Sequence, residues 1–173
     1  MLFRSLGEHG LSYFIQTKDR SLLFDTGQGL ALANNAAILG ADWQKVDAVV
    51  LSHGHYDHSG GLCFYSRQKD LPKIYAHPAA FEKKYAKSPQ NQFRPVGISD
   101  EAVSLFKDQA VWTKRPTEVA DGIWVTGQVP RENEWEQYSG PFYLDDRGLQ
   151  ADDLLDDQSI YFTTQQGVIV LLG

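Results

Sequence analysis

The sequence predicts a mixed α/β domain in which helices and β-sheets pack against one another in layers. Two observations support this fold class. Segments with the apolar patterns of strands are interleaved with segments that have the composition of helices. Two further pairs of strand-like segments are joined by short hairpin turns, at 121–122 and at 165–167. Because 173 residues suffice for one domain and not for two ordinary ones, we expect residues 1–173 to form a single domain.

The first third of the chain predicts two strands, a helix and a buried strand. Residues 10–16 and 21–24 have strand patterns and flank a polar turn. Residues 29–39 are rich in Ala and Leu, which favours a helix, and Gly40 stands where a C-cap glycine is common. Residues 46–51 are apolar except for one aspartate, a pattern typical of a strand that is buried on both faces.

The rest of the chain predicts further strands and helices around one irregular segment. The expected elements are, in order, a short helix opened by residues 59–61, a strand at 73–76, a helix at 79–86, a polar loop at 88–95, a helix at 100–107 capped by Ser99, a hairpin at 117–126 and a hairpin at 159–172. Residues 130–158 are irregular and acidic, and we expect their aspartate pairs to form a solvated face. The last strand, 168–172, has the pattern of a central strand.

Composition argues against several classes of partner. The net charge of −6 and the absence of a Lys/Arg-rich run argue against nucleic acid. The longest apolar run, 168–172, is far shorter than the ~20 residues that span a membrane, and residues 1–10 lack the layout of a signal peptide. Cys63 is the single cysteine, so no intrachain disulfide can form. We therefore expect a soluble, cytoplasmic protein that acts on a small molecule.

A cluster of metal-ligand residues follows the expected buried strand. His53, His55, Asp57 and His58 place three of the chain's five histidines around one aspartate. On a loop at the edge of a sheet, two of these imidazoles can face one ion, and the remaining pair can face a second ion ~3.5–4 Å away. Imidazole and carboxylate ligands suit Zn²⁺ first, with Mn, Fe or Mg as alternatives. Two such ions lower the pKa of a bridging water towards ~7 and supply hydroxide at neutral pH.

These residues carry a family resemblance. HGHYDHSGG after VDAVVLS is similar to the HxHxDH motif of the metallo-β-lactamase superfamily, and LLFDTG resembles its first motif. EHGLSYFIQT, IYAHP, TGQVPR and DDQSIYF resemble one branch, the proteins similar to dihydropterin ribofuranosyl-aminobenzene phosphate synthase. The resemblance covers nearly the whole chain. It implies the αββα sandwich of this superfamily, of which this chain would hold the N-terminal half to two-thirds.

The resemblance also implies roles for the clustered residues. His53 and His55 would bind the first metal of a dinuclear centre, and Asp57 and His58 would bind the second. Asp57 would also act in catalysis, by receiving a proton from the nucleophilic water. Asp25, in the first motif, would orient the metal-binding loop through hydrogen bonds. The implied activity is that of a metal-dependent hydrolase, which uses a metal-activated hydroxide on a small substrate, with a phosphorylated substrate as one option.

Asp25 also suggests a different catalytic mechanism. The tetrapeptide Phe24-Asp25-Thr26-Gly27 resembles the active-site loop of aspartic proteases. Those enzymes need two such aspartates that share one proton, and this chain has a single copy of the tetrapeptide. An aspartic protease would also leave the histidine cluster without a role. The sequence therefore favours Asp25 as a residue that supports the metal loop.

Three residues outside the cluster are candidates for substrate binding. His77 follows the expected strand 73–76 and can reach the same edge of the sheet as the histidine cluster. Arg131 can pair with an anionic group of the substrate, because a guanidinium forms bidentate hydrogen bonds with phosphate or carboxylate. His9 precedes the first expected strand, near the site in this branch. Each residue also has a plain structural alternative, as a strand-end histidine or as a solvated charge.

The C-terminal residues bear on whether the metal centre is complete. In the superfamily, a strand such as 168–172 leads into a turn that carries the next metal-binding histidine, and this sequence has no histidine after His77. The resemblance thus implies a domain that is incomplete at its C-terminus. Such a chain would need a complementing C-terminal fragment or a homo-oligomeric partner for catalysis. The alternative function is a catalytically inactive remnant that binds metal or another protein.

Overall fold

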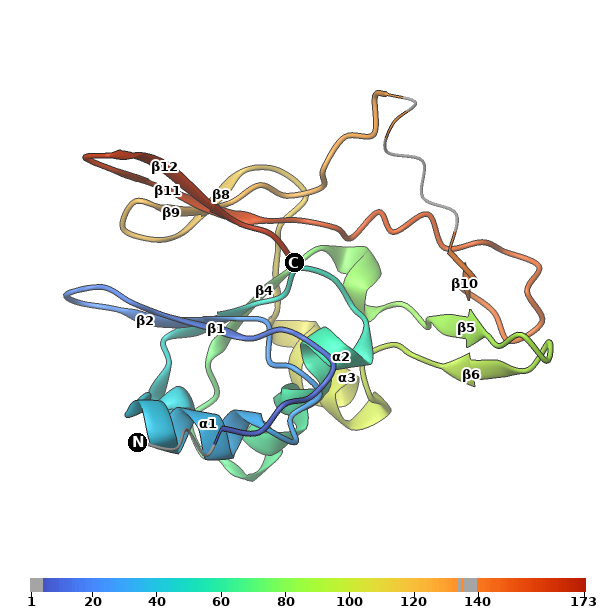
Figure 1. The fold of residues 1–173 in the computed structure, drawn as a ribbon, viewed down its shortest axis with the longest axis horizontal. Helices are drawn as coiled ribbons and strands as arrows, with labels where there is room; N and C mark the ends of the chain where they lie inside the picture. Colours follow the sequence, from blue (N-terminus) through green and yellow to red (C-terminus); the bar gives the residue numbers. More distant parts are fainter. Residues whose placement is uncertain (1–4, 134, 136–139) are drawn as a thin grey trace.

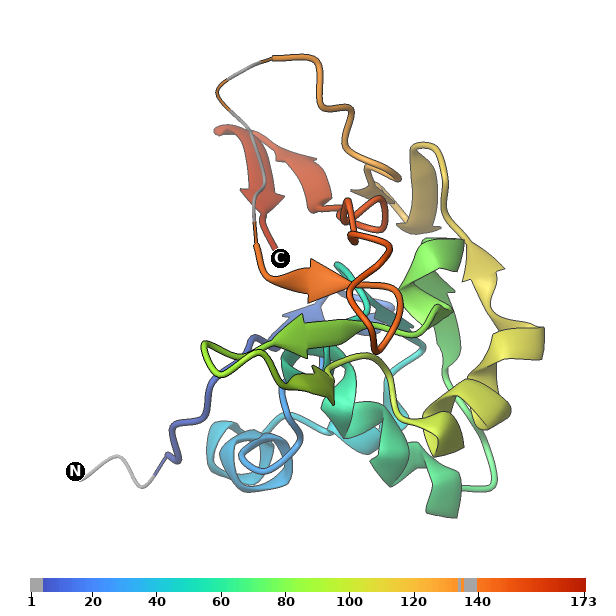
Figure 2. The same cartoon turned by 90° about the vertical axis from the view of Figure 1, so that its right-hand side faces the viewer.

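The computed structural model describes residues 5–133, 135 and 140–173. Its elements lie in layers: helices cover one face of a five-stranded sheet, and a four-stranded sheet lies over the other face (Figure 1). A small three-stranded sheet projects to one side of these layers, and Figure 2, viewed from that side, shows it in front. The mixed α/β layered class that the sequence predicts is confirmed. The described residues place no helix on the outer face of the four-stranded sheet (Figure 1).

Four parallel strands of the five-stranded sheet end at one edge. Its strand order is β1 (Tyr13–Gln16), β2 (Ser21–Phe24), β3 (Ala48–Val50), β4 (Lys73–Ala76) and β7 (Val111–Trp112). The pair β1–β2 is antiparallel, whereas β2, β3, β4 and β7 are parallel to their neighbours. Loops that follow parallel strands meet at the same edge of a sheet, where binding sites commonly form. Asp25, Ser52 and His77 follow β2, β3 and β4 and so gather at this edge.

Alternating side chains of this sheet build two separate cores. Leu23, Val49 and Ile74 pack against the helical layer. Leu22 and Val50 point the other way and pack against the four-stranded sheet. Because both faces are covered, the central residues of these strands are apolar on both sides, as the sequence predicts for 46–51.

The helical layer contains two α-helices with the capping residues that the sequence predicts. Helix α1 (Leu32–Leu39) ends at Gly40, whose left-handed φ of 69° is open to glycine without steric cost. Helix α3 (Asp100–Phe106) begins after Ser99, whose Oγ accepts a hydrogen bond of 3.3 Å from the amide of Ala102. Three short 3₁₀ helices complete the layer: η1 (Trp43–Lys45), η2 (Gly60–Arg67) and η4 (Lys107–Gln109).

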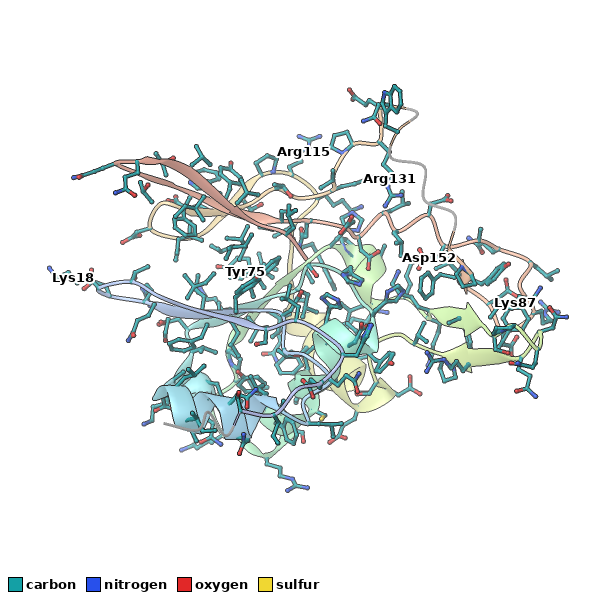
Figure 3. All side chains as sticks on the ribbon, viewed as in Figure 1. Lys18, Tyr75, Lys87, Arg115, Arg131 and Asp152 are labelled. Atoms are coloured by element: carbon teal, nitrogen blue, oxygen red, sulfur yellow. The ribbon has the colours of Figure 1, made fainter. Side chains whose placement is uncertain are left out.

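The four-stranded sheet is antiparallel and contains both predicted hairpins. Its order is β12 (Gly167–Leu171), β11 (Ile160–Thr164), β9 (Ile123–Val125) and β8 (Thr117–Ala120). Tyr75 of β4 lies between the two large sheets (Figure 3). The expectation that 168–172 forms a central strand was wrong for the described chain. Among the described strands β12 pairs with β11 alone, so it forms an edge and Val168 is 62% exposed.

The small sheet was missed from the sequence. It consists of β10 (Phe142–Tyr143), β5 (Tyr85–Lys87) and β6 (Phe93–Pro95), where we expected a helix at 79–86 and a loop at 88–95. Only a 3₁₀ turn, η3 (Pro78–Phe81), precedes β5. No helix forms at 79–86 because backbone groups of this stretch form hydrogen bonds with other segments of the chain. The Lys84 carbonyl accepts from the Val96 amide, and the Lys87 amide donates to the Pro141 carbonyl. Residues 134 and 136–139 of the expected irregular segment lie outside the described residues.

Among the described residues, no helix is both long enough and apolar enough to cross a membrane.

Candidate metal centre

The structure brings the four predicted metal ligands together directly after β3. We expected a loop, but its second half is the single-turn helix α2 (Tyr56–Ser59), which begins after His55. The turn forms because the amides of His58 and Ser59 both donate to the His55 carbonyl at 3.0 Å. The ring centre of His53 lies 4.8 Å from that of His55 and 4.1 Å from that of His58. Asp57 Oδ2 lies 3.9 Å from His58 Nε2.

Asp25 supports this cluster from the end of β2. Its side chain is fully buried and accepts three hydrogen bonds: from the Ser52 amide at 2.7 Å, from Ser52 Oγ at 2.6 Å and from His58 Nδ1 at 2.7 Å. Asp25 itself has a left-handed φ of 60°, which a non-glycine residue adopts rarely. These contacts hold one ring nitrogen of His58 and leave Nε2 on the side of Asp57. They are the contacts that the predicted orienting role of Asp25 requires.

Burial and neighbouring charges act differently on the histidines of the cluster. Burial raises the pKa of Asp25, opposed by the hydrogen bonds from His58 and Ser52. Burial alone lowers the pKa of His58, but the hydrogen bond and charge of Asp25 outweigh it, so this pKa is raised. Because three hydrogen bonds stabilise the ionised carboxylate, we place the shared proton on His58 Nδ1. Burial, followed by the charges of His58 and His55, lowers the pKa of His53 to about 2, so His53 is neutral at physiological pH.

His55 carries a buried nitrogen that lacks a partner. The residue is 7% exposed, and its ring centre lies 4.5 Å from that of Phe142 on β10. Its Nε2 is the single buried side-chain polar atom of the described residues without a hydrogen-bond partner. Leaving such an atom unpaired costs about 1–3 kcal/mol, so unsatisfied groups of this kind mark sites where something else binds. A divalent ion is a partner that suits an imidazole nitrogen, and the donor set around His55 fits one.

Asp57 is held by a histidine from the N-terminal segment. His9 Nδ1 lies 2.9 Å from Asp57 Oδ2, and the His9 side chain is 82% exposed. His9, a predicted substrate-binding residue, thus touches the site through a predicted ligand. Within the described residues, no three His, Cys, Asp or Glu side chains are already arranged as a ligand set.

The other two predicted substrate-binding residues lie at different depths. His77 is 6% exposed, follows β4 and accepts a hydrogen bond of 3.3 Å from the Ala79 amide through Nδ1. Arg131 lies on the loop that follows β9, in the upper part of Figure 3, and its Nη2 is 3.9 Å from Asp157 Oδ2. Substrate contact by either residue stays a prediction.

Sequence reasoning missed a buried charged group behind the cluster. Lys84, Asp152 and Asp156 are 1%, 6% and 0% exposed, so the expectation that the aspartate pairs form a solvated face was wrong for two of their members. Lys84 Nζ lies 2.7 Å from Asp152 Oδ2 and 3.1 Å from Asp156 Oδ1. A lysine that is far along the chain from two acidic pairs gives no local signal of such burial, because the pairing depends on how the chain folds.

Comparison with known proteins agrees with these observations. Residues 6–157 match the metallo-beta-lactamase superfamily. The chain is 33% identical to the uncharacterized protein MJ0448 of Methanocaldococcus jannaschii, over 94% of this chain and 61% of that protein. It is 26% identical to the 7,8-dihydropterin-6-methyl-4-(beta-D-ribofuranosyl)-aminobenzene-5'-phosphate synthase of the same organism, over 96% of this chain and 60% of the synthase.

A solved structure extends the comparison to three dimensions. Tm1679, described as a metal-dependent hydrolase of the beta-lactamase superfamily, superimposes with a TM-score of 0.75 at 26% identity. The match covers 99% of this chain and 61% of Tm1679, so the chain spans about three-fifths of the length of these relatives. From its motifs, its layered fold and these matches, we conclude that the chain belongs to the metallo-beta-lactamase superfamily.

Proposed function

We propose that this chain forms the metal-binding part of a metal-dependent hydrolase that acts on a small molecule. His53, His55, Asp57 and His58 would hold the metal, with zinc as the first choice. The observation that carries the proposal is the unpaired, buried Nε2 of His55 inside a cluster of three imidazoles. A satisfied core histidine would have a protein partner for this atom.

The residues of the chain divide the work of such a site. When bound, a divalent ion lowers the pKa of a water molecule and supplies hydroxide near neutral pH. Asp25 fixes the tautomer of His58 by accepting from Nδ1, and so presents Nε2 as a ligand. Ser52 Oγ lies 2.9 Å from His53 Nδ1. By accepting a hydrogen bond from this nitrogen, it fixes the tautomer of His53 and presents Nε2 as a ligand. Asp57, which lies beside the exposed His9, would receive a proton at Oδ2.

The surroundings of the cluster and the relatives support one substrate class. A phosphorylated small molecule is the specific option, because Arg131 can offer a guanidinium fork to a phosphate group. One relative is a synthase whose name includes a 5'-phosphate. His77 and His9 are the further candidates for contact with such a substrate.

Hydrolysis of a generic phosphodiester tests the proposal. Metal-stripped protein is assayed with bis(4-nitrophenyl) phosphate, with and without added Zn²⁺ or Mn²⁺. We expect hydrolysis that depends on the metal and is lost in His55→Ala. The control is Cys63→Ser, which alters a side chain of a type that can bind metal but that lies outside the predicted ligand set, and it should retain activity. Metal binding without hydrolysis would instead favour a non-catalytic metal-binding module, and failure to bind any metal would refute the proposal.

A further inference from the structure

The peptide between the two leading histidines is held from behind. The Gly54 amide donates a hydrogen bond of 2.7 Å to Asp156 Oδ2, and both groups are buried. On its other side, Gly54 packs so tightly that an added Cβ would lie 2.1 Å from the Ala80 carbonyl oxygen. Gly54 is therefore fixed between η3 and the segment that carries Asp156. Because His53 and His55 are its direct neighbours, their backbone positions are fixed with it.

A buried lysine completes the support for Asp156. Lys84 Nζ contacts one oxygen of Asp156 and one of Asp152. The other Asp156 oxygen accepts from Gly54, and the other Asp152 oxygen accepts from the Leu154 amide at 2.9 Å. Each of the four carboxylate oxygens thus has its own donor, so neither side chain can rotate without losing a hydrogen bond. Removing three charges from water is costly, and apolar residues of similar volume commonly give equal stability. The network is therefore better explained by the geometry that it imposes than by stability.

The segment that carries Asp156 also contacts other parts of residues 51–58, which we call the histidine loop. The Asp152 amide donates to the Phe142 carbonyl at 3.0 Å, and the Phe142 ring lies against His55. Gln158 donates two hydrogen bonds to this stretch: its backbone amide donates to the Ser52 carbonyl at 3.0 Å, and its side-chain Nε2 donates to the Leu51 carbonyl at 2.7 Å. Figure 3 shows Asp152 where this segment passes between the small sheet and the centre of the molecule. Segment 152–158 thus contacts the loop before and between the leading histidines, and reaches His55 through Phe142.

We propose that Asp156, held by Lys84, is a positioning residue of the metal centre. By fixing the Gly54 amide it sets the separation and orientation of His53 and His55, and this inference rests on the proposed metal-binding function. A carboxylate is needed because Asp156 faces two donors, Gly54 N–H and Lys84 Nζ. A side-chain amide has one acceptor oxygen, so Asp156→Asn must turn its NH₂ group towards one of the two donors.

The experiment compares Asp156→Asn with the matched variant Asp152→Asn in the full chain. Both substitutions remove one buried negative charge from Lys84, but only Asp156 touches the histidine loop. Zinc affinity is measured by competition with a chromogenic chelator, and the thermal unfolding midpoint is measured beside it. We expect a 10- to 100-fold loss of zinc affinity in Asp156→Asn, the range seen when supporting groups of metal ligands are removed. Asp152→Asn should lose less than about threefold with a similar shift in unfolding midpoint.

A spectroscopic readout separates positioning from a general loss of stability. In the cobalt-loaded protein the visible absorption bands should change in Asp156→Asn and stay as in the wild type in Asp152→Asn, because these bands report ligand geometry. Equal loss of zinc affinity in the two variants, or wild-type affinity in Asp156→Asn, would overturn the inference.

A measurement on the unaltered chain covers the case in which Asp156→Asn does not fold. Amide hydrogen exchange should show Gly54 protected as strongly as the amides of β3. Exchange at the rate of exposed loop amides would overturn the inference. A wild-type chain that binds no zinc would refute the proposed function, and the protection of Gly54 would still decide whether Asp156 holds the loop.

Discussion

The histidine loop is supported on two sides by buried carboxylates that act on different parts of it. Asp25, from the end of β2, bonds to the side chains of His58 and Ser52 as well as to the Ser52 amide. Asp156, from the segment before β11, bonds to the backbone of Gly54 and to Lys84. The Asp25 side aims an imidazole, whereas the Asp156 side fixes the path of the chain. A ligand set thus needs both rotamer control and backbone control.

The strongest test of this comparison is the loss of the Asp25 carboxylate. Asp25→Asn leaves at least one of its three donors without an acceptor in a fully buried place. We expect the free energy of unfolding to fall by about 3 kcal/mol. Urea unfolding measures this change. Asp19→Asn, in the exposed turn between β1 and β2, is the control and should unfold like the wild type. Wild-type stability in Asp25→Asn would contradict the central place of this residue.

The next largest effect is expected from Lys84, on the opposite side of the loop. Lys84→Met removes the shared cation and leaves Asp152 and Asp156 buried beside each other. Breaking a buried ion pair in this way lowers the free energy of unfolding by about 3–5 kcal/mol. Water that enters beside the two carboxylates reduces this cost, so we expect a loss of about 2–3 kcal/mol. Chemical denaturation checks the value. Restoration of stability in the triple variant with Asp152→Asn and Asp156→Asn would confirm that unpaired charge is the cause, and its absence would argue for lost packing.

The tight packing of Gly54 predicts a smaller loss. In Gly54→Ala the new methyl group must displace the Ala80 carbonyl of η3, because a Cβ at Gly54 would lie only 2.1 Å from the carbonyl oxygen. Overpacking of this kind costs about 1–3 kcal/mol. The control is Gly7→Ala, since a Cβ at Gly7 meets no atom within 4 Å. Equal thermal unfolding midpoints for the two variants would show that η3 yields easily and does not fix the loop.

The smallest effect concerns a carboxylate at the far end of the central sheet. The Ser21 amide and Arg20 hold the pKa of Asp47 below its usual value. Its contribution to stability is therefore present above the pKa of the unfolded chain and is lost as the pH falls through the lower folded pKa. Asp47→Asn should cost about 1 kcal/mol near neutral pH and less in acid. Unfolding at a series of pH values checks this. An Asp47→Asn deficit that grows in acid would contradict the assigned direction.

The two sides of the loop also differ in how much the sequence reveals. The Asp25 side lies within local patterns: the strand 21–24 followed by Asp25, and the apolar strand followed by HGHYDH. The same local rules give the Ser99 cap and the Gly40 C-cap. Such features depend on residues that are neighbours in the chain, so they can be predicted from the sequence.

The Asp156 side depends on contacts that no local pattern encodes. Gly54 and Asp156 are 102 residues apart, and Lys84 is 72 residues from Asp156. Read locally, the stretch around Lys84 favours a helix and the acidic pairs favour solvent, and tertiary pairing overrides both preferences. The proposed metal ligands could therefore be named from the sequence, whereas the buried carboxylate bonded to Gly54 became visible only in the structure.

Zinc titration of the metal-stripped chain tests the central claim most directly. We expect saturable binding of at least one Zn²⁺ per chain. His55→Ala should weaken this binding at least ~10-fold, because removing groups that a metal site depends on costs that much or more. His77→Ala, which removes a buried histidine outside the cluster, should bind zinc like the wild type. The absence of saturable binding, or an equal loss in His55→Ala and His77→Ala, would contradict the assignment of the histidine loop as a metal centre.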